Sequence, residues 1–99
     1  MCKLCVFAGT TEGRELVEFL AGQNAQVYAC VATEYGQTLL PPFPNVTVSA
    51  ARLTQPEMES LFQKEQFQLV IDATHPYAAA VTENIVAACA ATGQRCKLL

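Results

Sequence analysis

Short apolar runs alternate with helix-like segments along the whole of this 99-residue chain. The pattern predicts strands over residues 4–8, 26–32, 45–49, 67–71 and 96–99, and helices over 14–21, after Thr54, and over 78–91. Strands that alternate with helices form a parallel sheet, because the chain must cross over between successive strands. The sequence therefore predicts an α/β fold, with a parallel sheet of about five strands and helices on both faces.

Caps and prolines mark the ends of several predicted elements. Thr54 is followed three residues later by Glu57, which is the spacing of a capping box. Gly22 and Gly93 each follow a helical pattern and are predicted C-caps. Residues 35–44 contain three prolines, so we predict a loop there.

The composition excludes several classes of protein. Apolar residues make up 52% of the chain and charged residues 15%, which favours strands covered on both faces. The length allows one small domain. The six Lys and Arg residues are scattered and the net charge is −3, so we expect no nucleic-acid partner. No apolar stretch approaches the roughly 18 residues of a membrane span, so we expect no membrane contact.

The five cysteines are an odd number, and Cys2, Cys5 and Cys30 fall in strand-like runs. Buried free thiols in a reducing cytoplasm are the simplest interpretation, and we predict a cytoplasmic protein. Cys2 and Cys5 have a redox-like spacing, but on one strand they would lie on opposite faces. We therefore predict no shared metal and no disulfide for this pair.

The turn after the first predicted strand resembles a glycine-poor, shifted dinucleotide fingerprint of the Rossmann-like type. Gly9 allows a tight turn, and Gly13 lets the following helix approach the strand. Thr10 and Thr11 offer hydroxyls, next to Glu12, at a helix N-terminus that favours phosphate. The alternative is an ordinary capped turn, with a threonine as N-cap and Glu12 favouring the helix dipole.

The second and third strands end at further candidates. Glu34 follows Gly13 by about 20 residues, where an acid often binds the adenosine ribose and favours NADH. Thr33 and Tyr35 flank it, and Tyr35 could stack on a base or cover the sheet edge. Arg52 could bind a phosphate or a substrate carboxylate. The alternatives are a solvated loop acid and an exposed arginine before a helix.

The turn after the fourth predicted strand carries four groups that can hydrogen-bond or move protons. His75, the only histidine, suits proton transfer or anion binding, and Tyr77 lies beside it. Asp72 could orient backbone or ribose, or simply cap the turn. Thr74 is a candidate helix N-cap and Pro76 fits an early helical position. Such turns open onto the ligand crevice of a parallel sheet.

Three motifs, at residues 8–14, 32–36 and 72–78, stand in order along the chain. Together they resemble the precorrin-6A reductase family of cobalamin biosynthesis, including its cobalt-precorrin-6A branch. The chain departs from the family's pattern at Ala8 and Ala51, where glycine is common. The resemblance implies the N-terminal half of a two-domain enzyme with two Rossmann-like halves. Such an enzyme uses NADPH or NADH to reduce one double bond of a tetrapyrrole, bound between this half and a C-terminal domain that residues 1–99 lack.

The resemblance also implies roles for the motif residues. Nucleotide phosphates would lie beside Thr10, Thr11, Glu12 and Gly13. The adenosine end would lie beside Thr33, Glu34 and Tyr35. The nicotinamide and substrate would face Thr74, His75 and Tyr77. By themselves, the 99 residues should be inactive. The rival hypothesis is a non-catalytic nucleotide sensor, which would not need a histidine and a phenol at the fourth turn.

Overall fold

The computed structural model describes residues 2–38, 40, 43–75 and 78–99. The strands are β1 (Cys2–Ala8), β2 (Ala25–Cys30), β3 (Val46–Ser49), β4 (Leu69–Ala73) and β5 (Cys96–Leu98). The helices are α1 (Thr11–Leu20), α2 (Glu34–Thr38), α3 (Gln55–Glu65) and α4 (Ala79–Thr92). None of these helices is long and apolar enough to cross a bilayer.

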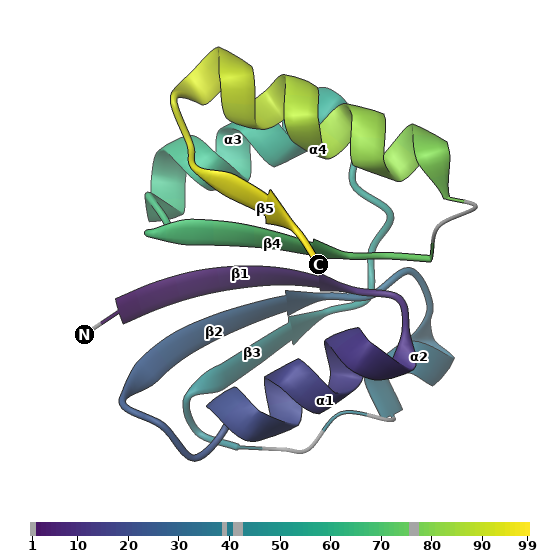
Figure 1. Cartoon of the computed structure of the whole chain (residues 1–99), viewed down its shortest axis with the longest axis vertical. Coiled ribbons are helices and arrows are strands. Elements are labelled where there is room, and N and C mark those ends of the chain that lie inside the picture. The colour runs from purple at the N-terminus through teal and green to yellow at the C-terminus, as the bar shows by residue number, and fades with distance from the viewer. Residues whose placement is uncertain (1, 39, 41–42, 76–77) are drawn as a thin grey trace.

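All neighbouring strands of the sheet are parallel, in the order β3-β2-β1-β4-β5. The order reverses between β1 and β4, because the chain winds outward from β1 in both directions. Figure 1 shows α3 and α4 on one side of the sheet and α1 on the other. The predicted Rossmann-like α/β fold is confirmed. The carboxyl ends of β1 and β4 form the switch point, where this class of sheet binds ligands.

Alternation along β1 builds the two halves of the core. Cys5 and Phe7 pack in the layer under α3 and α4, whereas Val6 and Ala8 pack in the layer under α1. Side chains on either face of β1 therefore pack against apolar neighbours, and helices cover both faces of the sheet. Cys2 and Cys5 lie on opposite faces by the same alternation, and all five cysteines are free thiols.

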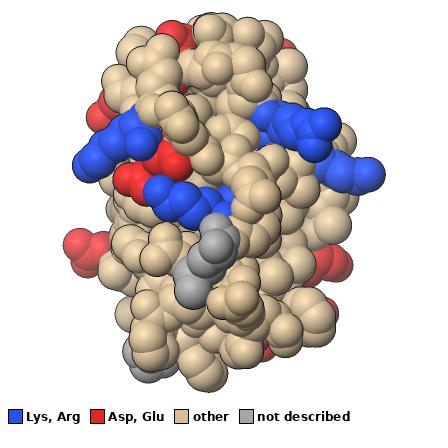
Figure 2. All heavy atoms as spheres, turned by 90° about the vertical axis from the view of Figure 1, so that its left-hand side faces the viewer, with Lys and Arg blue, Asp and Glu red and all other residues tan. Residues whose placement is uncertain are grey.

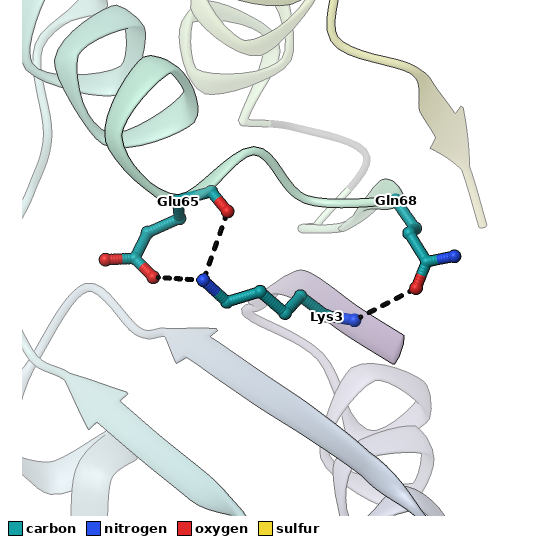
Figure 3. A network of polar contacts seen from close by, with 3 residues as sticks. All are labelled: Lys3, Glu65 and Gln68. Atoms are coloured by element: carbon teal, nitrogen blue, oxygen red, sulfur yellow. Dashed lines mark hydrogen bonds and ion pairs between the residues drawn. The ribbon is translucent and has the colours of Figure 1, made fainter. Parts of the chain in front are cut away.

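A polar network fixes the amino edge of the sheet, opposite the switch point (Figure 3). The Lys3 Nζ donates to Glu65 Oε1 at 3.0 Å and to the Glu65 carbonyl at 3.2 Å. The Gln68 side chain accepts from the Lys3 N–H, and the Gln68 N–H donates to the Lys3 carbonyl. These contacts join the start of β1 to the α3–β4 connection. Figure 2 shows this edge, with both basic and acidic side chains on it.

The helix ends confirm two predicted caps. The Thr54 hydroxyl accepts from the Glu57 N–H, and the Glu57 carboxylate accepts from the Thr54 N–H at 2.9 Å, which completes the capping box of α3. Gly93 caps α4 in the left-handed conformation, with φ of 72°. The predicted cap at Gly22 is wrong. Ala21 is the C-cap of α1, and it is right-handed, so no left-handed glycine is needed there.

The predicted loop over residues 35–44 is also wrong at its start, because α2 occupies Glu34–Thr38. The three prolines stand at positions 41, 42 and 44, beyond the helix, so they remove none of its N–H donors. The Thr33 hydroxyl accepts from the Gly36 N–H at 3.0 Å and so satisfies a donor of the first turn. The Thr33 hydrogen bond therefore supports the start of α2, and the prolines follow only after this helix has ended.

Candidate functional site

A cavity of about 730 Å³ opens at the carboxyl edge of the sheet. Its walls come from the β1–α1 turn, the segment from the end of β2 through α2, and the turn after β4. The lining residues are Ala8, Gly9, Thr10, Thr11, Glu12, Arg14, Val31, Ala32, Thr33, Gly36, Leu40 and His75. Six of the residues predicted from the sequence therefore line one cavity, although they come from three turns that are far apart in the chain.

Thr10 fixes the first wall through its side chain. Its hydroxyl accepts from the Gly13 N–H at 3.1 Å, which makes it the N-cap of α1. The same hydroxyl donates to the Ala73 carbonyl at 2.9 Å, and the Gly9 N–H donates to that carbonyl at 3.2 Å. A hydroxyl has one proton to donate, so Thr10 has none left for a ligand. The neighbouring Thr11 is exposed and lines the cavity.

Gly13 allows the close approach of α1 to the sheet. A Cβ at this position would lie 2.9 Å from the Ala73 Cβ and 3.0 Å from the Ala8 Cα. Both neighbours belong to rigid strands, so they have little room to move. Gly13 does not line the cavity, and its role in the structure is the packing of helix against strand. The sequence predicted this packing role, whereas the place beside the nucleotide phosphates that the resemblance also implied is not part of the cavity lining.

The N-terminus of α1 presents a surface suited to an anion. The N–H groups of Thr11 and Glu12 precede the first intrahelical donor, and among the described residues they have no hydrogen-bond partner. Such groups, together with the helix dipole, attract phosphate. Arg14 adds a positive charge to the wall. Its ion pair with Glu18 is long, at 3.9 Å, which leaves its guanidinium free to turn toward a ligand.

Arg14 was missed among the site residues predicted from the sequence. The signal was available, because residues three apart share one side of a helix and Arg14 follows Thr11 by three. The other residues missed are apolar or small: Ala8 at the end of β1, and Val31, Ala32, Gly36 and Leu40 on the second wall. They carry no chemical group that a motif search would select.

Asp72 lies beneath the fourth turn and is 3% exposed. Its Oδ1 accepts from the Thr74 N–H at 3.0 Å and from the Thr74 hydroxyl at 2.6 Å. Its Oδ2 accepts from the Thr82 hydroxyl at 2.7 Å. The predicted N-cap at Thr74 is therefore wrong, because the buried carboxylate takes its hydroxyl. Ala78 is the N-cap of α4 and makes no side-chain capping bond.

Among the described residues of the fourth turn, His75 is the one that lines the cavity. It is exposed, and its carbonyl accepts from the Ala78 N–H at 2.8 Å. His75 therefore lies beside the turn that begins α1, because a Cβ at Gly9 would lie 3.7 Å from the His75 backbone nitrogen. This arrangement can hold a phosphate-bearing ligand with one end close to an imidazole, a side chain suited to proton transfer.

Comparison with known families decides the identity. The family model described as "Precorrin-6x reductase CbiJ/CobK" matches residues 3–99. The chain belongs to the precorrin-6x reductase family. The resemblance inferred from the three motifs is confirmed.

Individual relatives in the precorrin-6x reductase family agree with this result. The precorrin-6A reductase of Rhodobacter capsulatus is 36% identical over 93 residues, which cover 94% of this chain and 36% of that protein. The cobalt-precorrin-6A reductase of Methanothermobacter thermautotrophicus is 34% identical over 89 residues, which cover 89% and 30%. The solved structure of a CobK precorrin-6A reductase matches all of this chain with a TM-score of 0.82 and 33% identity, over 39% of its own length. The chain thus spans about a third of the length of the relatives that it matches.

Two further described residues predicted as parts of a precorrin-6x reductase site, Glu34 and Arg52, do not line the cavity. Glu34 is exposed in the first turn of α2, and Arg52 is exposed in the connection between β3 and α3. The Tyr35 side chain, Pro76 and Tyr77 lie outside the part of the chain that the structure describes.

Proposed function

We propose that this chain is the N-terminal, nucleotide-binding half of an NAD(P)H-dependent reductase of cobalamin biosynthesis. The observation that carries the proposal is the cavity at the switch point, with α1 N–H groups on one wall and His75 on another. A reductase that acts on a large polar ring needs a site that binds the cofactor's phosphates and a side chain that can donate a proton near the cofactor. The α1 N–H groups and His75 fit these two needs. Family membership supports the same reading.

A bound nicotinamide dinucleotide would supply a hydride to the substrate. The residues that fit its phosphates are Thr11, through its hydroxyl, the N–H groups of Thr11 and Glu12, and Arg14. Gly9 lets the chain pass close to the ligand at the same turn. Thr33 and Gly36 would lie toward the adenosine end, on the second wall. We assign Thr10, Gly13, Asp72 and Thr74 to holding these walls in place.

Glu34 was the reason to favour NADH over NADPH. Its exposed position in α2, apart from the cavity lining, gives that preference no support. The proposal therefore includes both NADPH and NADH. Arg52 and Tyr35 stay as proposed contacts of the bound nucleotide's outer parts.

The proposed substrate is precorrin-6A or its cobalt form, a tetrapyrrole with several carboxylates. It would lie between this half and a second half, which the relatives' greater length leaves room for. There, His75 and Tyr77 would give a proton or bind a carboxylate. In this proposal the 99 residues alone bind the nicotinamide cofactor but do not catalyse reduction of the substrate. The five unpaired thiols support a location in the reducing cytoplasm.

The first experiment tests nucleotide binding by this chain. NADPH and NADH are titrated separately, and binding is followed through nicotinamide fluorescence. We expect saturable binding that is weakened by Arg14→Gln, which removes the charge in the lining. Lys64→Gln is the matched control, because Lys64 lies in the last turn of α3, away from the cavity. An absence of binding at millimolar nucleotide would contradict the proposal.

The second experiment separates a reductase from a nucleotide sensor. This chain replaces the corresponding third of the Rhodobacter capsulatus precorrin-6A reductase, and reduction of precorrin-6A is measured. We expect turnover by the chimera, and a loss of it in both His75→Ala and Tyr77→Phe. A chimera that binds nucleotide but reduces nothing would favour the sensor. Full activity in both variants would show that the active-site assignment is wrong.

A further inference from the structure

Thr82 does not line the cavity, but its hydroxyl donates to the buried carboxylate of Asp72. Asp72, Thr74 and Thr82 form a hydrogen-bonded group, which we call the Asp72 cluster. We propose that Thr82 is a positioning residue, which acts through Asp72 to fix the turn that carries His75 at the mouth of the cavity. This inference rests on the proposed function, since it concerns the same site.

The Asp72 cluster joins the two sides of the turn. Asp72 lies near the end of β4, and Thr82 lies in the first turn of α4. Each carboxylate oxygen bonds to a different residue. Oδ1 accepts from the N–H and the hydroxyl of Thr74, and Oδ2 accepts from the hydroxyl of Thr82. The carboxylate is buried, so water cannot replace a lost donor cheaply.

Thr82 also anchors a helix that has no side-chain cap. The N-cap of α4, Ala78, has no side chain that can accept from the first turn. The contact between Thr82 and Asp72 is the side-chain hydrogen bond that holds the described start of this helix to the sheet. It brings a negative charge to the N-terminal turn, where the helix dipole favours one. Without it, the Thr74 hydroxyl would still bond to Asp72, but the start of α4 would be joined to β4 mainly through the backbone.

The neighbouring wall of the cavity, at the β1–α1 turn, depends on the same stretch of chain. The Ala73 carbonyl accepts from the Gly9 N–H and from the Thr10 hydroxyl. A Cβ at Gly9 would lie 3.5 Å from the Thr74 Cα, so the two turns are in close contact. A shift of residues 72–75 would therefore move His75 and disturb the phosphate-binding turn together. This is the physical route from Thr82 to the ligand.

The test uses two readouts on this chain. The first is the affinity for NADPH and NADH. The second is the NMR signal of the imidazole ring, which is unambiguous because the chain contains one histidine. Thr82→Val removes the hydroxyl and keeps the shape, and Thr82→Ser restores the hydroxyl. Thr92→Val is the matched control, because the Thr92 hydroxyl donates to the Ala88 carbonyl at 2.8 Å in the last turn of the same helix.

We expect Thr82→Val to weaken nucleotide affinity roughly tenfold, through loss of positioning, and to shift the His75 ring signals. Thr82→Ser and Thr92→Val should match the unmodified chain in both readouts. Unchanged affinity and unchanged His75 signals in folded Thr82→Val would overturn the inference. If Thr82→Val does not fold, Asp72→Asn takes its place under the same expectations. An unmodified chain that binds no nucleotide would count against the proposed function alone, and the His75 signals would still decide the role of Thr82.

Discussion

The Thr10 hydroxyl donates a hydrogen bond to the Ala73 carbonyl, 2.9 Å away, and so joins the ends of two neighbouring strands. The same oxygen caps α1 by accepting from the Gly13 N–H. One side chain thus fixes a helix to its own turn and that turn to β4. Thr11, the next residue, has the same chemistry but lies exposed on the cavity wall. The two threonines should therefore respond differently to the same substitution.

Thr10→Val should destabilise the fold by about 1–2 kcal/mol, because it removes an N-cap and leaves a strand-end carbonyl with one donor fewer. Thr11→Val should change the free energy of unfolding by less than about 0.5 kcal/mol and weaken nucleotide binding instead. Urea denaturation and nucleotide titration of both variants give the comparison. Equal losses of stability would contradict this division between a structural and a ligand-facing threonine.

Gly13→Ala should destabilise the fold by roughly 1–3 kcal/mol through overpacking. The added methyl would lie 2.9 Å from the Ala73 Cβ, which is too close for a real contact, and this outweighs the better helix propensity of alanine. Gly22→Ala is the control, because a Cβ there meets nothing within 4 Å. We expect the control to be neutral or slightly stabilising in thermal unfolding. A Gly13→Ala variant as stable as its control would show that α1 can move away from the sheet.

The capping box of α3 predicts an acid-sensitive contribution to stability. Hydrogen bonds from Thr54 hold the pKa of Glu57 below its ordinary value. A lowered folded-state pKa stabilises the fold above the unfolded pKa, near 4.3, and this contribution is lost as the pH falls through the folded pKa. The stability difference between the unmodified chain and Glu57→Ala should therefore be largest near neutral pH and shrink in acid. A difference that grows in acid would contradict the capping role.

The cysteines should differ in reactivity according to burial. Burial, and then the neighbouring Cys96, raise the pKa of Cys89 to about 12, and contact with Cys30 raises that of the buried Cys5 well above its ordinary value. At pH 8 both therefore stay protonated, and the thiol is a poor nucleophile. Iodoacetamide should modify the exposed Cys96 first, as read by peptide mass spectrometry, and reach Cys5 and Cys89 only after unfolding. Early labelling of Cys89 would mean that the end of α4 opens readily.

The sequence was sufficient for the sheet and for the local turn chemistry. Strand and helix signals, the capping box at Thr54 and Glu57, and the packing role of Gly13 all depend on neighbours within a few residues. That is why they could be predicted. The gathering of three turns around one cavity also followed, since parallel strands end at one edge.

The errors arose where several groups compete for the same atom or where the backbone takes an unexpected course. The Thr74 hydroxyl suits an N-cap by its position in the sequence, but the carboxylate of Asp72 is buried beside it and accepts its proton. The partner on the far side, Thr82, has no local signal at all. Glu34 has the spacing of a ribose ligand, but the unexpected helix α2 sets its direction. Such outcomes depend on burial and on where a backbone turns, which no short motif encodes.

The parallel course of β5 has a practical consequence for handling this protein. Leu99 follows β5 and donates its N–H to the Asp72 carbonyl at 2.9 Å, so it lies beneath the turn that carries His75. Cys2 begins β1 at the opposite edge of the sheet. A fluorescent reporter or surface linker placed before Cys2 would leave the nucleotide entrance open. The same group attached at Leu99 would start next to the Asp72 backbone, where it could report on changes in the turn that carries His75.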